Sequence, residues 1–168
     1  VVLADLLRQL GTVVEPIPSD PDADPLEALV GLVSDAQRPA DPAALRLFPD
    51  GYRDDEQAAA EFRRFTEQSL RQAKSAAART ALDTLQRGAE KVVMSLSEAQ
   101  AWLGALNDLR LVIGTRLEVA EDGPESGDLD PDDPALPGLV MYEWTTWLQS
   151  TLIEALLPLA QTEADGQP

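Results

Sequence analysis

The sequence contains no cysteine and no histidine among its 168 residues. The chain can therefore form no disulfide, offers no thiol nucleophile and cannot build a zinc site of the Cys/His type or use imidazole as a general acid or base. An enzyme built on this chain would depend on Asp, Glu, Ser, Tyr or Lys, and no pairing of these residues suggests one. We therefore expect a protein that is not an enzyme and that holds no cofactor and no metal.

Long apolar runs are also missing, so no segment is predicted to span or anchor in a membrane. The opening residues, Val1 to Asp5, lack the basic segment that begins a signal peptide. Together with the absence of cysteine, which fits a reducing compartment, this predicts a cytoplasmic protein. Because the chain does not begin with Met, we also expect native sequence before Val1.

Basic residues are few: 13 Lys and Arg stand against 30 Asp and Glu, which gives a net charge of -17. Residues 53–91 hold eight of the bases and seven acids, so the rest of the chain holds five bases and 23 acids. Such a field repels phosphate backbones, and we expect no direct DNA binding by this chain. The same field would attract a basic protein surface, although the plainer interpretation is that it keeps the protein soluble.

What the sequence does contain is helical periodicity, with apolar residues making up 44% of the chain. The longest periodic segment runs from about Asp55 to Arg87 and predicts a long helix, which is either unbroken or bent or split near Ser75 to Ala78. Its predicted buried stripe is Ala59, Phe62, Thr66, Ser69, Leu70, Ala73, Ala77, Ala81 and Leu85.

Shorter helices are predicted on both sides of this segment, and no stretch alternates as a strand would. Before the long segment, they are a helix over residues 2–10 that ends at Gly11, a short helix after Asp24-Pro25, and a turn of helix after Asp41-Pro42 with Leu47 and Phe48 packed on the core. After it, a helix begins at a capping box at Ser97 to Gln100, and a last helix runs from about Leu139 to Leu157. The residues of the capped helix that face the core are predicted to be Ala99, Trp102, Leu103, Leu106, Leu109, Ile113 and Leu117. The sequence thus predicts one all-α domain over residues 1–168, a bundle of four or five main helices.

An acidic, proline-containing linker is predicted at about residues 120–137, before the last helix, and we expect it to be mobile and disordered. Asp128, Asp130 and Asp132 match the opening of an EF-hand loop. The match then fails, because Asp133 stands at the position of the required glycine and Leu139 at that of the bidentate glutamate. We expect no calcium site there.

The candidate binding residues lie in the helix before this linker. Asn107, Asp108 and Arg110 stand among leucines, and polar groups buried there must be paired. One interpretation is an anion or partner site on Arg110, with Asn107, Asp108 and Arg116 as further contacts. The favoured one is a structural network in which Arg110 is buried and paired with a carboxylate or with backbone carbonyls. Gly114, one turn further, would let another helix approach closely.

The candidate interface lies in the last helix. Its main apolar stripe is Tyr142, Leu148, Leu152, Leu156 and Leu159, and Trp144 and Trp147 lie beside it. We expect these two tryptophans to form an interface, in part with a second copy of the chain, because tryptophan is enriched at the energetic centres of interfaces. The competing interpretation is that both tryptophans complete the core of the monomer.

Three stretches together resemble an actinobacterial family known as a domain of unknown function, some of whose members are oxidative-stress transcription regulators of the AosR type. They are residues 47–55 (LFPDGYRDD), residues 102–117 (WLGALNDLRLVIGTRL) and Tyr142-Glu143-Trp144 with Leu148-Gln149. The resemblance implies a helical regulatory protein that acts through a protein partner in the transcription machinery, such as a sigma factor, and it supplies no catalytic residues.

Two points of function stay open at this stage. Redox sensing through thiols would need cysteine, so it either belongs to sequence before Val1 or does not operate through cysteine in this member. The alternative to a regulator is a small-molecule-binding or enzymatic helical domain centred on Asn107, Asp108 and Arg110.

Overall fold

The computed structural model describes residues 2–18, 37–88, 91–119, 127 and 129–165. Helices cover 74% of these residues and no strand occurs among them, which confirms the all-α prediction. The helices are α1 (Val2–Val13), α3 (Pro42–Leu47), α4 (Glu56–Arg87), α5 (Leu96–Arg116) and α6 (Leu136–Asp165). The helix predicted after Asp24-Pro25 lies outside the described residues, as do residues 120–126 and 128 of the acidic linker.

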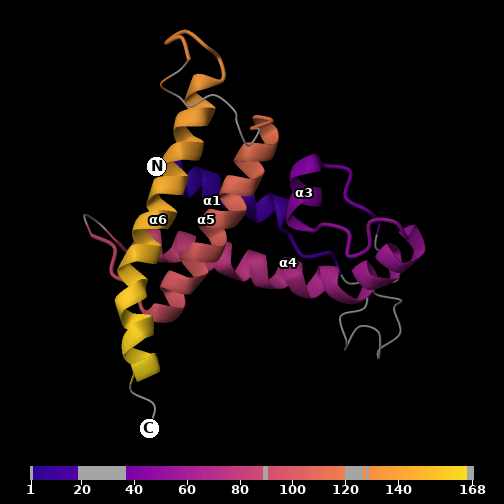
Figure 1. Ribbon diagram of the computed structural model, residues 1–168, viewed down its shortest axis with the longest axis horizontal. Helices are drawn as coiled ribbons and strands as arrows, with labels where there is room; N and C mark the ends of the chain where they lie inside the picture. Colours follow the sequence, from indigo (N-terminus) through magenta and orange to yellow (C-terminus); the bar gives the residue numbers. More distant parts are fainter. Residues whose placement is uncertain (1, 19–36, 89–90, 120–126, 128, 166–168) are drawn as a thin grey trace.

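Helix α5 is the centre of the bundle, because it contacts each of the other four described helices. Figure 1 shows α5 and α6 side by side, with α4 running across them and α3 beside the upper part of α5. The main buried cluster comes from α1, α3, α4 and α5 and includes Leu7, Leu10, Phe48, Leu106 and Leu109. The predicted burial of Leu47 and Phe48 is thus confirmed.

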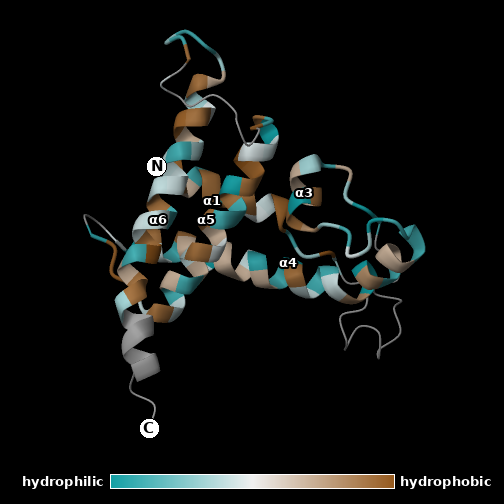
Figure 2. Ribbon diagram, viewed as in Figure 1, coloured by the Kyte–Doolittle hydropathy of each residue, from teal (hydrophilic) through white to brown (hydrophobic). Residues whose placement is uncertain are grey.

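Helix α4 confirms the predicted long helix and is continuous through Ser75 to Ala78. The carboxylate of Asp55 caps its start by accepting a hydrogen bond from the backbone N–H of Ala58, at 2.9 Å. Figure 2 shows polar and apolar residues alternating along its length rather than forming one apolar stretch.

The predicted buried stripe of α4 is wrong in most of its first half, although Ala59 is buried as predicted. Phe62 and Leu70 are 44% and 43% exposed, whereas Arg63 and Glu67 are buried. This half packs against the turn after α3 and the end of α1, where buried charges are paired with one another. A search for apolar residues at helical spacing cannot identify a buried helix face that consists of paired charges. In the second half Ala81 is buried in the main cluster as predicted. Ala78, which the predicted stripe did not include, is buried there too, while Ala77 is only half-buried.

Helix α5 begins two residues before the predicted capping box. Its N-cap is Ser95, not Ser97, and Glu98 closes the box by accepting a hydrogen bond from the backbone N–H of Ser95 at 2.7 Å. Glu98 also pairs with Arg87 at the end of α4, which favours this choice of cap. The predicted burial of Ala99, Trp102, Leu106 and Leu109 is confirmed, while Leu103, Ile113 and Leu117 are half-buried.

Two predicted helix ends are wrong, and both helices are longer than expected. Helix α1 continues through Gly11 to Val13, and the fully buried Val14 follows it into the core. Helix α6 begins at Leu136 and continues through Pro158 to Asp165. Proline lacks an N–H donor and weakens a helix, but a helix can continue beyond it.

Candidate functional site

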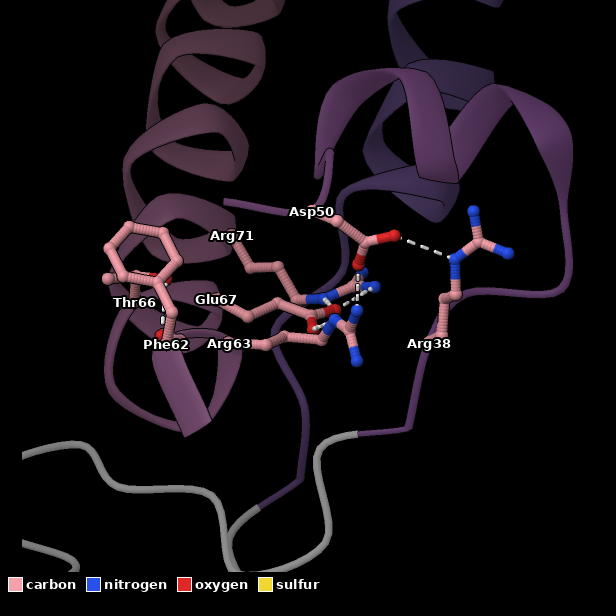
Figure 3. Close-up of polar contacts among 7 residues, drawn as sticks. All are labelled: Arg38, Asp50, Phe62, Arg63, Thr66, Glu67 and Arg71. Carbon is pink, nitrogen blue, oxygen red and sulfur yellow. Dashed lines mark hydrogen bonds and ion pairs between the residues drawn. The ribbon is translucent and has the colours of Figure 1, made fainter. Parts of the chain in front are cut away.

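A buried charge network surrounds the first half of α4 (Figure 3). Asp50, in the turn after α3, accepts hydrogen bonds from Arg38, at 2.9 Å, and from Arg63 of α4. Arg63 is only 9% exposed, so its charge needs a partner. Asp50 belongs to the LFPDGYRDD stretch, which therefore holds the start of α4 in place.

Glu67 lies one turn further along α4 and is 2% exposed. One of its carboxylate oxygens accepts a hydrogen bond from Nε of Arg71, at 2.8 Å. The other accepts no hydrogen bond and lies 3.9 Å from Nε of Arg63. A single buried carboxylate thus stands between two guanidinium groups.

Arg71 connects this network to two other segments. Its guanidinium donates hydrogen bonds to the backbone carbonyls of Val13, at 3.2 Å, and Glu15, at 3.1 Å, and lies over the Phe48 ring at 4.3 Å from the centroid. The network therefore joins α1, the turn after α3, and α4. Sequence reasoning missed it, although the spacing of Arg63, Glu67 and Arg71 places the three side chains on one helix face.

Arg110 occupies a different environment, between α5 and α6. Its Nε donates to the hydroxyl of Thr146 at 2.8 Å, its Nη1 donates to the amide oxygen of Gln149 at 2.7 Å, and its guanidinium lies 5.7 Å from the centroid of the Tyr142 ring. The prediction of a carboxylate or backbone carbonyl partner is wrong, because both acceptors are neutral side chains of α6. Arg110 is half-buried rather than fully buried.

The other three predicted contact residues do not join Arg110. Asn107 is exposed. Asp108 is buried and pairs with Lys74 of α4 at 2.7 Å. Burial raises the pKa of the Asp108 carboxyl, and the Lys74 ammonium opposes this shift. Arg116 is exposed and lies 3.5 Å from Asp41, the N-cap residue of α3.

A cavity of about 470 Å³ opens beside Arg110, between α3, α5 and α6. Its lining consists of Arg46, Arg110, Leu111, Gly114, Thr115, Glu118, Val119 and Tyr142. Gly114 allows the close approach of α6 that was expected, because a Cβ there would lie 3.2 Å from the Tyr142 ring. The cavity is of a size that holds small molecules.

Trp144 and Trp147 lie on the side of α6 that faces away from α5. They are 38% and 60% exposed, and Val140, one turn before Trp144, is 47% exposed. The interpretation that both tryptophans complete the monomer core is therefore wrong. Together Val140, Trp144 and Trp147 form an exposed apolar stripe, here called the tryptophan stripe.

None of the helices in the described part of the chain is long and apolar enough to cross a bilayer. No solved structure matches the chain.

Two curated relatives are similar along most of their length. Proteins of Mycobacterium tuberculosis and Mycobacterium bovis, both named oxidative stress regulator AosR, are 35% identical to this chain over 172 residues, which cover 92% of it and 78% of each relative. The model of a family described as a domain of unknown function, DUF2017, matches residues 1–156. The chain thus belongs to the DUF2017 family.

Proposed function

We propose that this chain is a non-enzymatic cytoplasmic regulator of an oxidative stress response, and that it acts by binding a protein of the transcription machinery, such as a sigma factor. The observation that carries the proposal is the similarity to relatives named oxidative stress regulators, which extends over 92% of the chain. The match also covers 78% of each relative, so it is not confined to one short shared segment.

Two features of the molecule support a protein partner. The tryptophan stripe exposes large apolar side chains, which are the residues that supply most binding energy at protein interfaces. The net charge of -17 favours association with a basic protein surface and disfavours DNA. The tryptophan stripe would provide most of the binding affinity. The negative charge would raise the rate of encounter with a basic partner and favour that partner over acidic proteins.

The test uses the purified chain and individually purified sigma factors of its own organism, with binding measured by titration calorimetry. We expect one of them to bind, with an affinity that falls as salt rises. Trp147→Ala should weaken that binding by at least about tenfold, the loss expected for an interface anchor. Phe65→Ala is the matched control, because Phe65 is a 55% exposed aromatic residue on α4.

Sedimentation velocity on the same samples separates this proposal from self-association. A dimer that disappears in Trp147→Ala, with no sigma factor bound, would assign the tryptophan stripe to a second copy of the chain and overturn the sigma-factor proposal. Screened repulsion between two acidic chains would make such a dimer tighten with added salt.

A further inference from the structure

We propose that the cavity between α3, α5 and α6 binds a small organic anion through Arg46 and Arg110, with a carboxylate or phosphate as the recognised group. This site is separate from the tryptophan stripe, since Arg110 contacts α6 on the side that packs against α5. Binding there goes beyond the proposed partner function and does not depend on it.

The first argument is the placement of positive charge. Outside residues 53–91, the chain has only five bases: Arg8, Arg38, Arg46, Arg110 and Arg116. Two of these five line this one cavity. A third, Arg116, lies nearby, since it pairs with Asp41 at the start of α3. In a region of the sequence with 23 acids, chance spacing would not be expected to gather the few bases around one cavity.

The second argument is that these two guanidinium groups lack a counter-ion. Arg63 and Arg71, the other arginines that are largely buried, both pair with carboxylates. Arg110 is held by a hydroxyl and an amide oxygen, and it forms no ion pair with any residue that the structure describes. Within the same described ranges, Arg46 makes no hydrogen bond or ion pair. A half-buried positive charge without a negative partner is unfavourable, and a bound anion would supply that partner.

The third argument is orientation. Thr146 and Gln149 engage Nε and Nη1 of Arg110, which leaves Nη2 with both of its N–H donors available. Neutral acceptors fix the plane of the guanidinium without cancelling its charge, and a fixed planar fork is the geometry that binds carboxylate and phosphate oxygens best.

The remaining lining limits the kind of ligand. Leu111, Val119 and the Tyr142 ring provide an apolar wall, while Glu118 places one carboxylate in the same lining. Glu118 repels a ligand with negative charge at both ends. The site therefore fits a compact molecule with one oxyanion group, directed at the arginines, and a small apolar body.

The experiment titrates isotopically labelled protein with two probes, sodium benzoate and inorganic phosphate, at constant ionic strength against sodium chloride, and follows amide chemical shifts by NMR. Benzoate combines a carboxylate with an apolar body, and phosphate carries the oxyanion alone. We expect saturable shifts at residues lining the cavity. Tighter binding of benzoate would assign the ligand class to carboxylates with an apolar body, and tighter binding of phosphate would assign it to phosphates.

Arg46→Gln is the test variant, because Arg46 is exposed and makes no hydrogen bond or ion pair with the residues that the structure describes. It should weaken binding about tenfold, as expected for losing one charge-assisted hydrogen bond. Arg53→Gln removes the same charge from an exposed arginine that does not line the cavity, and it should bind like the wild type. Shifts no larger than those with chloride, or an equal loss in both variants, would overturn the proposal.

Discussion

Two regions of this molecule hold arginine side chains that are at least half-buried, and they do so by opposite means. Around the first half of α4, Arg63 and Arg71 are neutralised by the carboxylates of Asp50 and Glu67. Between α5 and α6, Arg110 is positioned by Thr146, Gln149 and the Tyr142 ring, none of which carries a negative charge. The comparison indicates that the first region is structural, while the second keeps its charge for a ligand.

The largest expected effect comes from breaking the first region. Glu67→Gln keeps the shape of the side chain but removes the buried carboxylate that lies between the guanidinium groups of Arg63 and Arg71. We expect a loss of about 3 to 5 kcal/mol in the free energy of unfolding, the range for removing one partner of a buried ion pair. Urea denaturation followed by circular dichroism measures it.

Glu61→Gln, at an exposed position on the same helix, is the control and should change stability by less than about 0.5 kcal/mol. If Glu67→Gln were as harmless as this control, the network would contribute little to the fold and the contrast with Arg110 would lose its basis.

A smaller effect is expected from Arg110→Ala. The structure shows neutral partners and half-burial, so the loss should be about 1.5 to 2 kcal/mol, the lower part of the range for hydrogen bonds to charged groups. A double-mutant cycle with Gln149→Ala should give a coupling of about 1 kcal/mol. A loss as large as that of Glu67→Gln would mean that Arg110 is also a structural charge.

The smallest expected effect is a dependence of stability on pH that arises from Asp108. Its charge is paired with Lys74, but burying that charge costs free energy. Burial raises the pKa of this carboxyl above its ordinary value, so the folded state binds the proton more tightly than the unfolded state. The stability that the folded state gains by binding this proton is fully present below the ordinary pKa of an aspartate. It is lost as the pH rises through the raised pKa of Asp108 in the folded state.

Asp108→Asn removes this titration. The free energy of unfolding of the wild type, measured relative to Asp108→Asn, should therefore decrease as the pH is raised from about 4 towards neutrality. Chemical denaturation of both proteins across that interval would check the slope. An increase would show that the attraction of Lys74 exceeds the effect of burial.

The parts of the fold that the sequence predicts are those where apolar residues recur at helical spacing. Leu106 and Leu109 in α5 follow that pattern and are buried, and α4 has strong capping signals at Asp55 and Gly88. The first half of α4 escaped prediction because Arg63 and Glu67, which face inward, have the residue types of an exposed face.

The candidate site was predictable only in part, for a different reason. Arg110 stands out among leucines in the sequence, but its partners Thr146 and Gln149 are 36 and 39 residues away. Only the packing of α6 against α5 brings these residues together, and no local sequence pattern shows which helices pack against each other. Asp108 was included in the same predicted site because it is close to Arg110 in the sequence. Its side chain instead pairs with Lys74 of α4.

The position of α6 in the bundle has a consequence for how the protein can respond to force or to a partner. The main buried cluster belongs to α1, α3, α4 and α5, and α6 adds to it only the half-buried Leu148 and Leu152. Separating α6 from α5 therefore exposes less apolar surface than unfolding the whole domain, and such a step requires only part of the global free energy. We therefore expect the helix that carries both exposed tryptophans to open at a lower free energy than the remaining helices, which keep their shared core.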